Sequence, residues 1–370
     1  MLRYFFAFVM LVHGFIHFMG FIKAFGFADI EQLTQDISRS AGLFWLVAGI
    51  LFLLTVLLYL MNIDSWWMIS LPAIIISQAL IIMSWQDAKF GTVVNIIILG
   101  VAIIALGQWS FRQVTMNTVR EMLPDEIGKP EMITDETIQE LPPVIQQWLR
   151  KTNVVGRERT VTVHLTQQGE MKTNPDGNWI PFTAEQWFTP REPGFVWLAN
   201  VKAAPGVHLS GRDVFMDGQG HMLIKLLSLV PVVNSTGDEI NQGTLLRYLG
   251  EVNWFPSGAV SEFIQWEQLD SISAKATMTY KGVTDSGIFR FTEDGDLASY
   301  QAKRFYERKE GATLEDWLIE MDPESFVEID GVRIGTKSTV TWRLDEGDYT
   351  WLKLEITDIE YNQVTSENIH

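Results

Sequence analysis

The sequence predicts a four-helix transmembrane bundle followed by a mainly β domain, in which roughly ten antiparallel strands form a curved sheet or half-barrel around one or two helices. Four long apolar stretches lie in the first third of the chain. Short alternating runs separated by turn motifs fill the rest, and one amphipathic helical segment interrupts them. The predicted boundaries are a transmembrane domain at 1–112, a linker at 113–133, and a β-rich soluble domain at 134–370 with a covering helix near 239–254.

Charge separates these two halves. Residues 1–112 carry five basic and five acidic side chains, whereas the remainder carries 23 basic and 40 acidic ones, so the whole net charge of −17 lies in the soluble half. This sign argues against nucleic acid as a partner, because phosphates would be repelled. The chain has no cysteine, which excludes disulfides, thiol catalysis and cysteine-ligated zinc. The sequence indicates no particular protein partner.

The apolar stretches are each close to the ~20 residues that cross a bilayer as a helix. A backbone in lipid must satisfy its own hydrogen bonds, so we expect helices and contact with membrane lipid. Three basic residues flank the spans on each side, so the positive-inside rule leaves the side of the soluble domain open. The four predicted spans are 2–21, 42–61, 66–85 and 91–111.

Two histidines in the first span, His13 and His17, lie four residues apart and therefore on one helix face. Such a pair can bind a metal, haem or quinone, pass a proton, or hold an acidic head group. The alternative that we favour is structural, with both rings hydrogen-bonded to polar residues of neighbouring helices. No cofactor is therefore predicted, and a metal or haem at this pair stays an alternative. The polar residues available as partners are Ser77, Gln78, Asn95 and Gln108.

After the linker, Thr134 can cap a short helix that breaks at Pro142 and Pro143 before a second one. Strands then follow at the spacing of a sandwich or barrel. The very apolar run at 222–233 contains a lysine and a proline, and we expect a strand leading into a buried loop there. The predicted strands are 160–166, 185–189, 195–201, 207–216, 262–269, 273–280, 287–291, 297–306, 326–329, 332–343 and 349–359.

The segment 241–256 is the one confident helix among the strands. Its apolar stripe, which includes Tyr248, should cover a sheet, and Trp254 should anchor its end. Arg247 and Glu251 lie on the opposite side, where a surface or structural ion pair, most often solvated, is the favoured interpretation. If they instead faced a concave sheet, they could bind a polar head group or act as acid and base.

No familiar enzymatic motif is present. The sequence has no Gly-x-Ser-x-Gly, phosphate-binding loop, His-Glu-x-x-His or dinucleotide motif. Several middle strands are apolar on both faces and rich in aromatic residues, which favours a covering element or a bound ligand. The predicted ligand-binding residues are Arg247, Tyr248, Glu251, Trp254, Trp187 and Trp197.

Four sets of residues form recognisable motifs: His13-Gly-x-x-His17-x-x-Gly20-Phe21, Glu140-Leu-Pro-Pro143 with Trp148-Leu149, Asp217-Gly-x-Gly220 and Arg247-Tyr-Leu-x-Glu251-x-x-Trp-Phe-Pro256. Together they resemble an uncharacterised family of bacterial membrane proteins of unknown function. The resemblance covers most of the chain from Thr134 onward and implies no activity; with the four spans it suggests a multi-pass protein of the bacterial cytoplasmic membrane. More distantly, the soluble half is similar to the curved sheets of periplasmic lipoprotein carriers, although the four helices argue against shuttling.

Three hypotheses follow from these patterns. The first is a non-enzymatic, membrane-tethered module that binds an apolar or amphipathic, lipid-like ligand under the helix. The second is an enzyme that acts on a membrane-embedded substrate with Glu251 and Arg247. The third is a metal, haem or quinone site at His13 and His17, with the β domain as an accessory.

Overall fold

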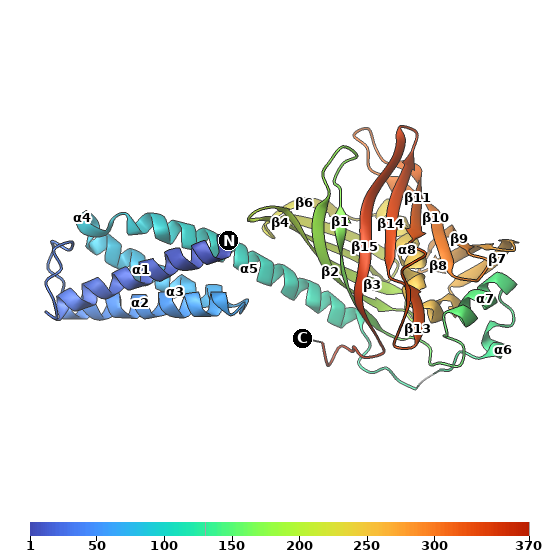
Figure 1. Ribbon diagram of the computed structural model, residues 1–370, viewed down its shortest axis with the longest axis horizontal. Coiled ribbons are helices and arrows are strands. Elements are labelled where there is room, and N and C mark those ends of the chain that lie inside the picture. Colours follow the sequence, from blue (N-terminus) through green and yellow to red (C-terminus); the bar gives the residue numbers. More distant parts are fainter. Residues whose placement is uncertain (130, 370) are drawn as a thin grey trace. The chain divides into compact units, whose positions relative to one another are not determined.

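The computed structural model describes residues 1–129 and 131–369, so Pro130 of the predicted linker and the terminal His370 lie outside the described residues. The chain divides into two compact units, Met1–Arg112 with Leu227–Leu229, and Gln113–Leu226 with Val230–His370. The first unit is helical and the second is a curved antiparallel sheet around a helix (Figure 1). The predicted fold class is therefore confirmed.

Four helices of the first unit are long and apolar enough to cross a membrane, which indicates membrane insertion. Small residues allow α1 and α2 to approach closely. A Cβ atom at Gly20 would overlap the ring of Trp45, and one at Gly14 would lie 3.0 Å from Phe52 Cβ. The helices are α1 (Leu2–Ala24), α2 (Arg39–Leu60), α3 (Trp66–Met83), the short α4 (Trp85–Ala88) and α5 (Gly91–Met122).

Helix α5 continues past the predicted end of the fourth span. Hydropathy falls at Arg112, but the helical spacing of apolar residues continues, with Met116 and Val119 buried against Trp187 of the sheet. The chain from Gln113 onward thus belongs to the second unit while still helical. Hydropathy alone could not predict where α5 ends, because it identifies the apolar segment that crosses the membrane and not the full length of the helix.

Two short helices, α6 (Asp135–Ile138) and α7 (Pro143–Lys151), precede the sheet as predicted. Thr134 and Thr137 form a capping box at the start of α6. Helix α7 begins at a proline, which is compatible with a first helical position, and buries Trp148 in the main core.

The sheet has thirteen antiparallel strands among the described residues, more than the ten predicted. Its order is β6-β5-β4-β3-β2-β1-β15-β14-β11-β10-β9-β8-β7, and β12 pairs with β13 separately. The strands are β1 (Val163–Met171), β2 (Ile180–Thr189), β3 (Gly194–Ala204), β4 (Val207–Met216), β5 (Gln219–Leu226), β6 (Val230–Ser235), β7 (Ile264–Asp270), β8 (Ser273–Tyr280), β9 (Val283–Phe291), β10 (Leu297–Tyr306), β11 (Thr313–Met321), β12 (Phe326–Ile329), β13 (Val332–Gly335), β14 (Lys337–Leu344) and β15 (Gly347–Tyr361).

Some strand predictions differ from the structure. The predicted strand 332–343 is divided into β13 and β14, which lie in different sheets. The run 222–233 is not a strand leading into a buried loop: it spans most of the β5–β6 hairpin, and Val230 and Val232 of the edge strand are 58% and 54% exposed. Pro231 is tolerated there because an edge strand leaves one side of its backbone unpaired. Strand β11 was not predicted, because Glu315 and Asp316 interrupt its apolar alternation.

Helix α8 (Asp238–Glu251) lies inside the curve of the sheet (Figure 1). It contacts β4 and β5 as well as β8, β9 and β10, strands from opposite ends of the sheet order, so the sheet must curl around the helix. Glycines permit this close packing. A Cβ at Gly220 would lie 2.5 Å from Thr244 Oγ1, and one at Gly250 would lie 2.6 Å from the ring of Tyr300.

Candidate functional site

The C-terminal half of α8 closes directly on the sheet. Tyr248 and Leu249 are fully buried, and Tyr248 packs against Phe255 and Phe188 with ring centres 5.7 Å and 6.4 Å away. The carbonyl of Trp254, which follows the helix, accepts a hydrogen bond of 2.6 Å from a tyrosine hydroxyl of β15. This half of the helix therefore fills the core as a plug and leaves no room for a ligand.

Arg247 and Glu251 form a structural ion pair, as one form of the favoured prediction had it, but the pair is buried and not solvated. Arg247 Nε donates to Glu251 Oε1 at 2.8 Å, and Arg247 Nη1 donates to Asp213 Oδ2 of β4 at 2.7 Å. The side chain of Arg247 is 15% exposed, that of Glu251 is 7% exposed and that of Asp213 is 2% exposed. The physical reason is that the sheet curls around α8. It covers the apolar stripe of the helix and also the opposite side, where Arg247 and Glu251 lie.

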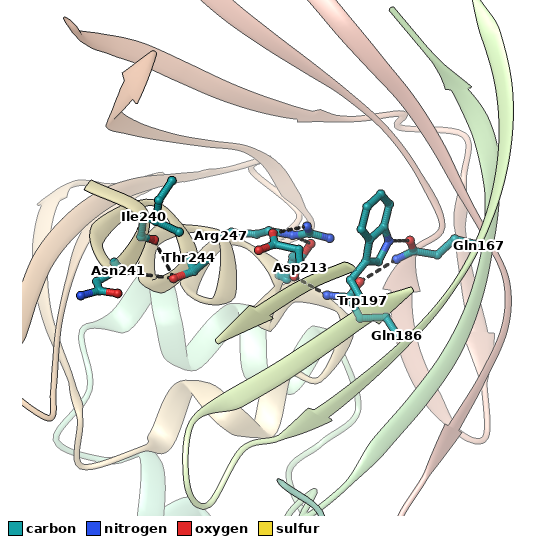
Figure 2. Close-up of polar contacts among 9 residues, drawn as sticks. Gln167, Gln186, Trp197, Asp213, Ile240, Asn241, Thr244 and Arg247 are labelled. Atoms are coloured by element: carbon teal, nitrogen blue, oxygen red, sulfur yellow. Dashed lines mark hydrogen bonds and ion pairs between the residues drawn. The ribbon is translucent and has the colours of Figure 1, made fainter. Parts of the chain in front are cut away.

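A chain of buried hydrogen bonds extends this pair across the sheet (Figure 2). Gln186 Nε2 of β2 donates to Glu251 Oε2 at 2.8 Å, and Gln167 Nε2 of β1 donates to Gln186 Oε1 at 3.0 Å. Trp197 Nε1 of β3 donates to Gln167 Oε1 at 2.8 Å. Each oxygen of Glu251 thus accepts a hydrogen bond from a protein group, and the side chain is 7% exposed.

Arg247 is held charged by this environment. Burial acts against the charge, but Glu251 and Asp213 together raise the pKa of the Arg247 guanidinium above its ordinary value. Its guanidinium carbon lies 4.9 Å from the ring centre of Trp197 and 5.0 Å from that of Phe195, within the range of cation–π contacts. Arg247 is therefore a fully partnered part of the core.

The six predicted binding residues do not form one site. Arg247, Glu251 and Trp197 belong to the buried network, whereas Tyr248 and Trp254 lie in the packed aromatic core. Trp187 points to the outer face of β2, because side chains alternate along a strand and its neighbour Gln186 points inward. Trp187 stacks on His164 at 5.1 Å and packs against α5.

Sequence reasoning missed a second arginine inside the curved sheet, the partly buried Arg304 of β10. Its guanidinium carbon lies 4.2 Å from the ring centre of Trp317. Among the described residues Arg304 has no hydrogen-bond or ion-pair partner, and its Nε atom is buried. Burial lowers the pKa of Arg304 to about 10, so the group stays charged at neutral pH. One signal was available, because alternation with Tyr300 and Ala302 places Arg304 on the inner face.

A cavity of about 490 Å³ borders the N-terminal half of α8 and is lined by both Arg304 and Asp213. The Oδ1 atom of Asp213 is buried and has no partner in the described part of the chain. The carboxylates of Glu239 and Glu307, both exposed residues, also line this cavity. Its apolar lining residues are Met222, Val232, Val233, Ile240, Phe305 and Ala312.

A second hollow of about 710 Å³ is lined mainly by β1, β2, β11, β14 and β15. Three of its polar groups are paired with one another: Gln168 Nε2 donates to Glu355 Oε2 at 3.0 Å, and Lys337 Nζ lies 3.5 Å from Glu355 Oε1. Charged groups that are exposed and already paired gain little from a ligand. The smaller cavity is therefore the better candidate site, despite its size.

In the helical unit, the two histidines take part in a polar cluster. His13 Nε2 lies 3.0 Å from Asn95 Oδ1, and His17 Nε2 lies 2.9 Å from Ser77 Oγ. Asn95 Nδ2 also donates to Gln78 Oε1 at 3.1 Å. These contacts are those of the structural hypothesis, in which Asn95 and Ser77 are two of the expected partners of the histidine rings. Within residues 1–129 and 131–369, no group of three His, Asp or Glu side chains could hold a metal ion.

Together these features define a membrane-inserted helical unit joined to a β half-barrel that encloses a helix, a charged network and a cavity. Residues 131–354 match the model of a family of unknown function (DUF6544). The match covers more than half of the chain, so the protein belongs to this family, which confirms the resemblance to an uncharacterised family.

No curated protein matches the chain. Among solved structures, the chain is similar to a domain assigned to outer membrane lipoprotein sorting from Vibrio parahaemolyticus, with 8% identity and a TM-score of 0.31 over 56% of this chain and 88% of that chain. A similarity this weak transfers no ligand or activity.

Proposed function

We propose that this protein is a membrane-anchored, non-enzymatic module that binds an apolar or amphipathic, lipid-like ligand in the cavity beside α8. The observation that carries the proposal is the cavity itself, which combines six apolar side chains with the unpartnered groups of Arg304 and Asp213. Its volume of about 490 Å³ lies within the ~300–1,000 Å³ typical of small-molecule sites.

The four apolar helices support a lipid-like ligand, because a module held at a bilayer has membrane lipids at high local concentration. We place the protein in the bacterial cytoplasmic membrane as a multi-pass protein. A reporter fused after the last residue, read for activity inside or outside the cell, would identify the side of the β domain.

The enzyme hypothesis has less support. Both oxygens of Glu251 accept hydrogen bonds, and neither Glu251 nor Arg247 is among the described residues that line the two cavities. A general acid or base must reach the proton that it transfers. The third hypothesis, a metal or haem at His13 and His17, is tested by metal analysis and an absorption spectrum of the purified protein.

Native mass spectrometry of the full chain, purified in a neutral maltoside detergent, tests the binding proposal. We expect a bound amphiphile to accompany the wild-type protein and to be lost from Ala312→Phe, which fills the cavity from a partly exposed position. The matched control is Ala203→Phe, at an exposed position near the end of β3. A wild-type protein that carries no amphiphile and takes none up would overturn the proposal.

A further inference from the structure

The guanidinium of Arg304 carries a positive charge in a largely desolvated position, where a charge without a bound partner is unfavourable. Its Nε atom is buried without a partner, and no described carboxylate lies within ion-pair distance of it. A buried charge is costly unless a counter-charge or hydrogen-bonding partner accompanies it. Asp213 attracts this charge without a hydrogen bond or ion pair to it, and its Oδ2 atom is bound by Arg247 at 2.7 Å, so the N–H groups of Arg304 still lack an acceptor.

The surroundings of Arg304 hold its guanidinium in a fixed position. The guanidinium of Arg304 lies against Gly243 of α8. A Cβ atom at Gly243 would lie 3.1 Å from Arg304 Nη2, so a larger residue there would crowd the guanidinium. The ring of Trp317 lies 4.2 Å from the guanidinium carbon on another side. A guanidinium stacked through its face keeps its edge N–H groups available for in-plane hydrogen bonds. Arg304 lines the cavity, so a ligand there can reach these donors.

Building on the proposed function, we propose that Arg304 binds the anionic oxygen atoms, carboxylate or phosphate, of the head group of an amphipathic ligand in this cavity. Arg304 supplies a charge-assisted, two-pronged contact of the kind that guanidinium makes with such oxyanions. The apolar side chains of the same cavity, including Val233 and Ile240, contact the chain of the ligand.

Three acidic residues line the cavity, Asp213, which is paired with Arg247, and the exposed Glu239 and Glu307, and they restrict the charge of this head group. Glu239 and Glu307 face the same space as Arg304. The first negative charge on a ligand gains the contact with Arg304. Each further negative charge is repelled by the carboxylates and has no second unpartnered cation to contact among the described lining residues. A head group with a single negative charge, such as a carboxylate or a phosphodiester, is therefore favoured.

The test measures the binding of two amphiphiles with the same acyl chain to the full-length protein in neutral maltoside detergent. Laurate carries a carboxylate, and monolaurin carries an uncharged glycerol head. We expect the wild-type protein to bind laurate about tenfold or more tightly than monolaurin, since a hydrogen-bonded charge contributes on this scale. Arg304→Gln should abolish this preference by weakening laurate, with monolaurin changed less than about twofold.

Lys303→Gln is the matched control. Lys303 is the neighbouring residue on β10, points to the opposite face and pairs with Asp316 at 3.1 Å, so its loss changes the net charge equally without touching the cavity. It should keep the wild-type preference for laurate. Arg304→Lys should retain part of that preference, because an ammonium keeps the charge but loses the two-pronged geometry. Thermal unfolding of Arg304→Gln should occur at or above the wild-type temperature, which separates lost binding from lost folding.

The possible failures are distinguishable. If Arg304→Gln keeps the wild-type preference while both amphiphiles still bind, the role of Arg304 is overturned and the proposed function stands. If neither amphiphile binds the wild-type protein, the proposed function falls as well. Inorganic phosphate is the third probe: if it alone binds as tightly as laurate and displaces it, the site holds a free anion and the amphiphilic ligand is overturned.

Discussion

Two arginines inside the same half-barrel have opposite surroundings. Arg247 contacts two carboxylates at 2.7 Å and 2.8 Å and belongs to the packed core, whereas Arg304 has no anionic partner among the described residues and borders a cavity. The charge of the first is offset by carboxylates that contact it, whereas the second is attracted to Asp213 and Glu251 only from beyond hydrogen-bond distance. The difference shows that burial alone does not identify a binding site; an unpartnered charge beside free space is the more informative feature.

The largest effect should come from Arg247. We expect Arg247→Met to lower the free energy of unfolding by about 3–5 kcal/mol, because it leaves Asp213 and Glu251 buried without their counter-charge. Chemical unfolding of the full chain, followed by tryptophan fluorescence, measures this loss. A variant that also carries Asp213→Asn and Glu251→Gln should recover part of the stability. A loss below about 1 kcal/mol would show that the network is not the buried, paired core described above.

The two halves of α8 should respond differently to the same kind of substitution. Leu249→Ala, in the packed half, should cost about 2–5 kcal/mol through the cavity that it creates. Ile240→Ala, in the half that borders the cavity, should cost about 1 kcal/mol or less, because part of its side chain already faces open space. Equal losses of unfolding free energy for the two variants would remove the distinction between plug and cavity wall.

Sequence patterns predicted the individual helices and strands better than the contacts between them. The bounds of β8 and β10 follow from alternation, and α8 follows from its apolar stripe, because both depend on neighbours in the sequence. The partnership of Arg247 with Asp213 depends on how far the sheet curls, which no local pattern encodes. For the same reason a surface or structural pair, most often solvated, was predicted where the structure has a buried one.

Alternation within strands carried more information about the site than residue type did. Trp187 was selected as an aromatic residue, but its position in β2 directs it outward, and the adjacent Gln186 reaches Glu251 instead. Arg304 shares the inward direction of Tyr300 and was passed over because charged residues are usually exposed. Its lack of a partner required three-dimensional coordinates, since the surrounding groups come from α8, β4 and β11.

Glu251 separates the enzyme hypothesis from the structural one. We expect Glu251→Gln to lower the free energy of unfolding by about 1–2 kcal/mol, because the amide keeps the volume and one acceptor but loses the charge that pairs with Arg247. Binding of laurate should stay within about twofold of wild type, because Glu251 does not line the cavity. A variant that folds normally but loses an in-cell phenotype would favour a catalytic or binding role for this carboxylate.

The smallest expected effect has the opposite sign. Arg304→Met should raise the free energy of unfolding of the ligand-free protein by up to about 1 kcal/mol, because a thioether replaces a partly buried guanidinium that makes no hydrogen bond with a described protein group. The same denaturation measurement in excess laurate should reverse the order, since only the wild-type protein gains stability from binding the carboxylate tightly. Natural sequences retain destabilising groups chiefly where function needs them. If Arg304→Met instead destabilised the ligand-free protein as strongly as Arg247→Met, then Arg304 would be a second structural arginine, and the contrast between the two would disappear.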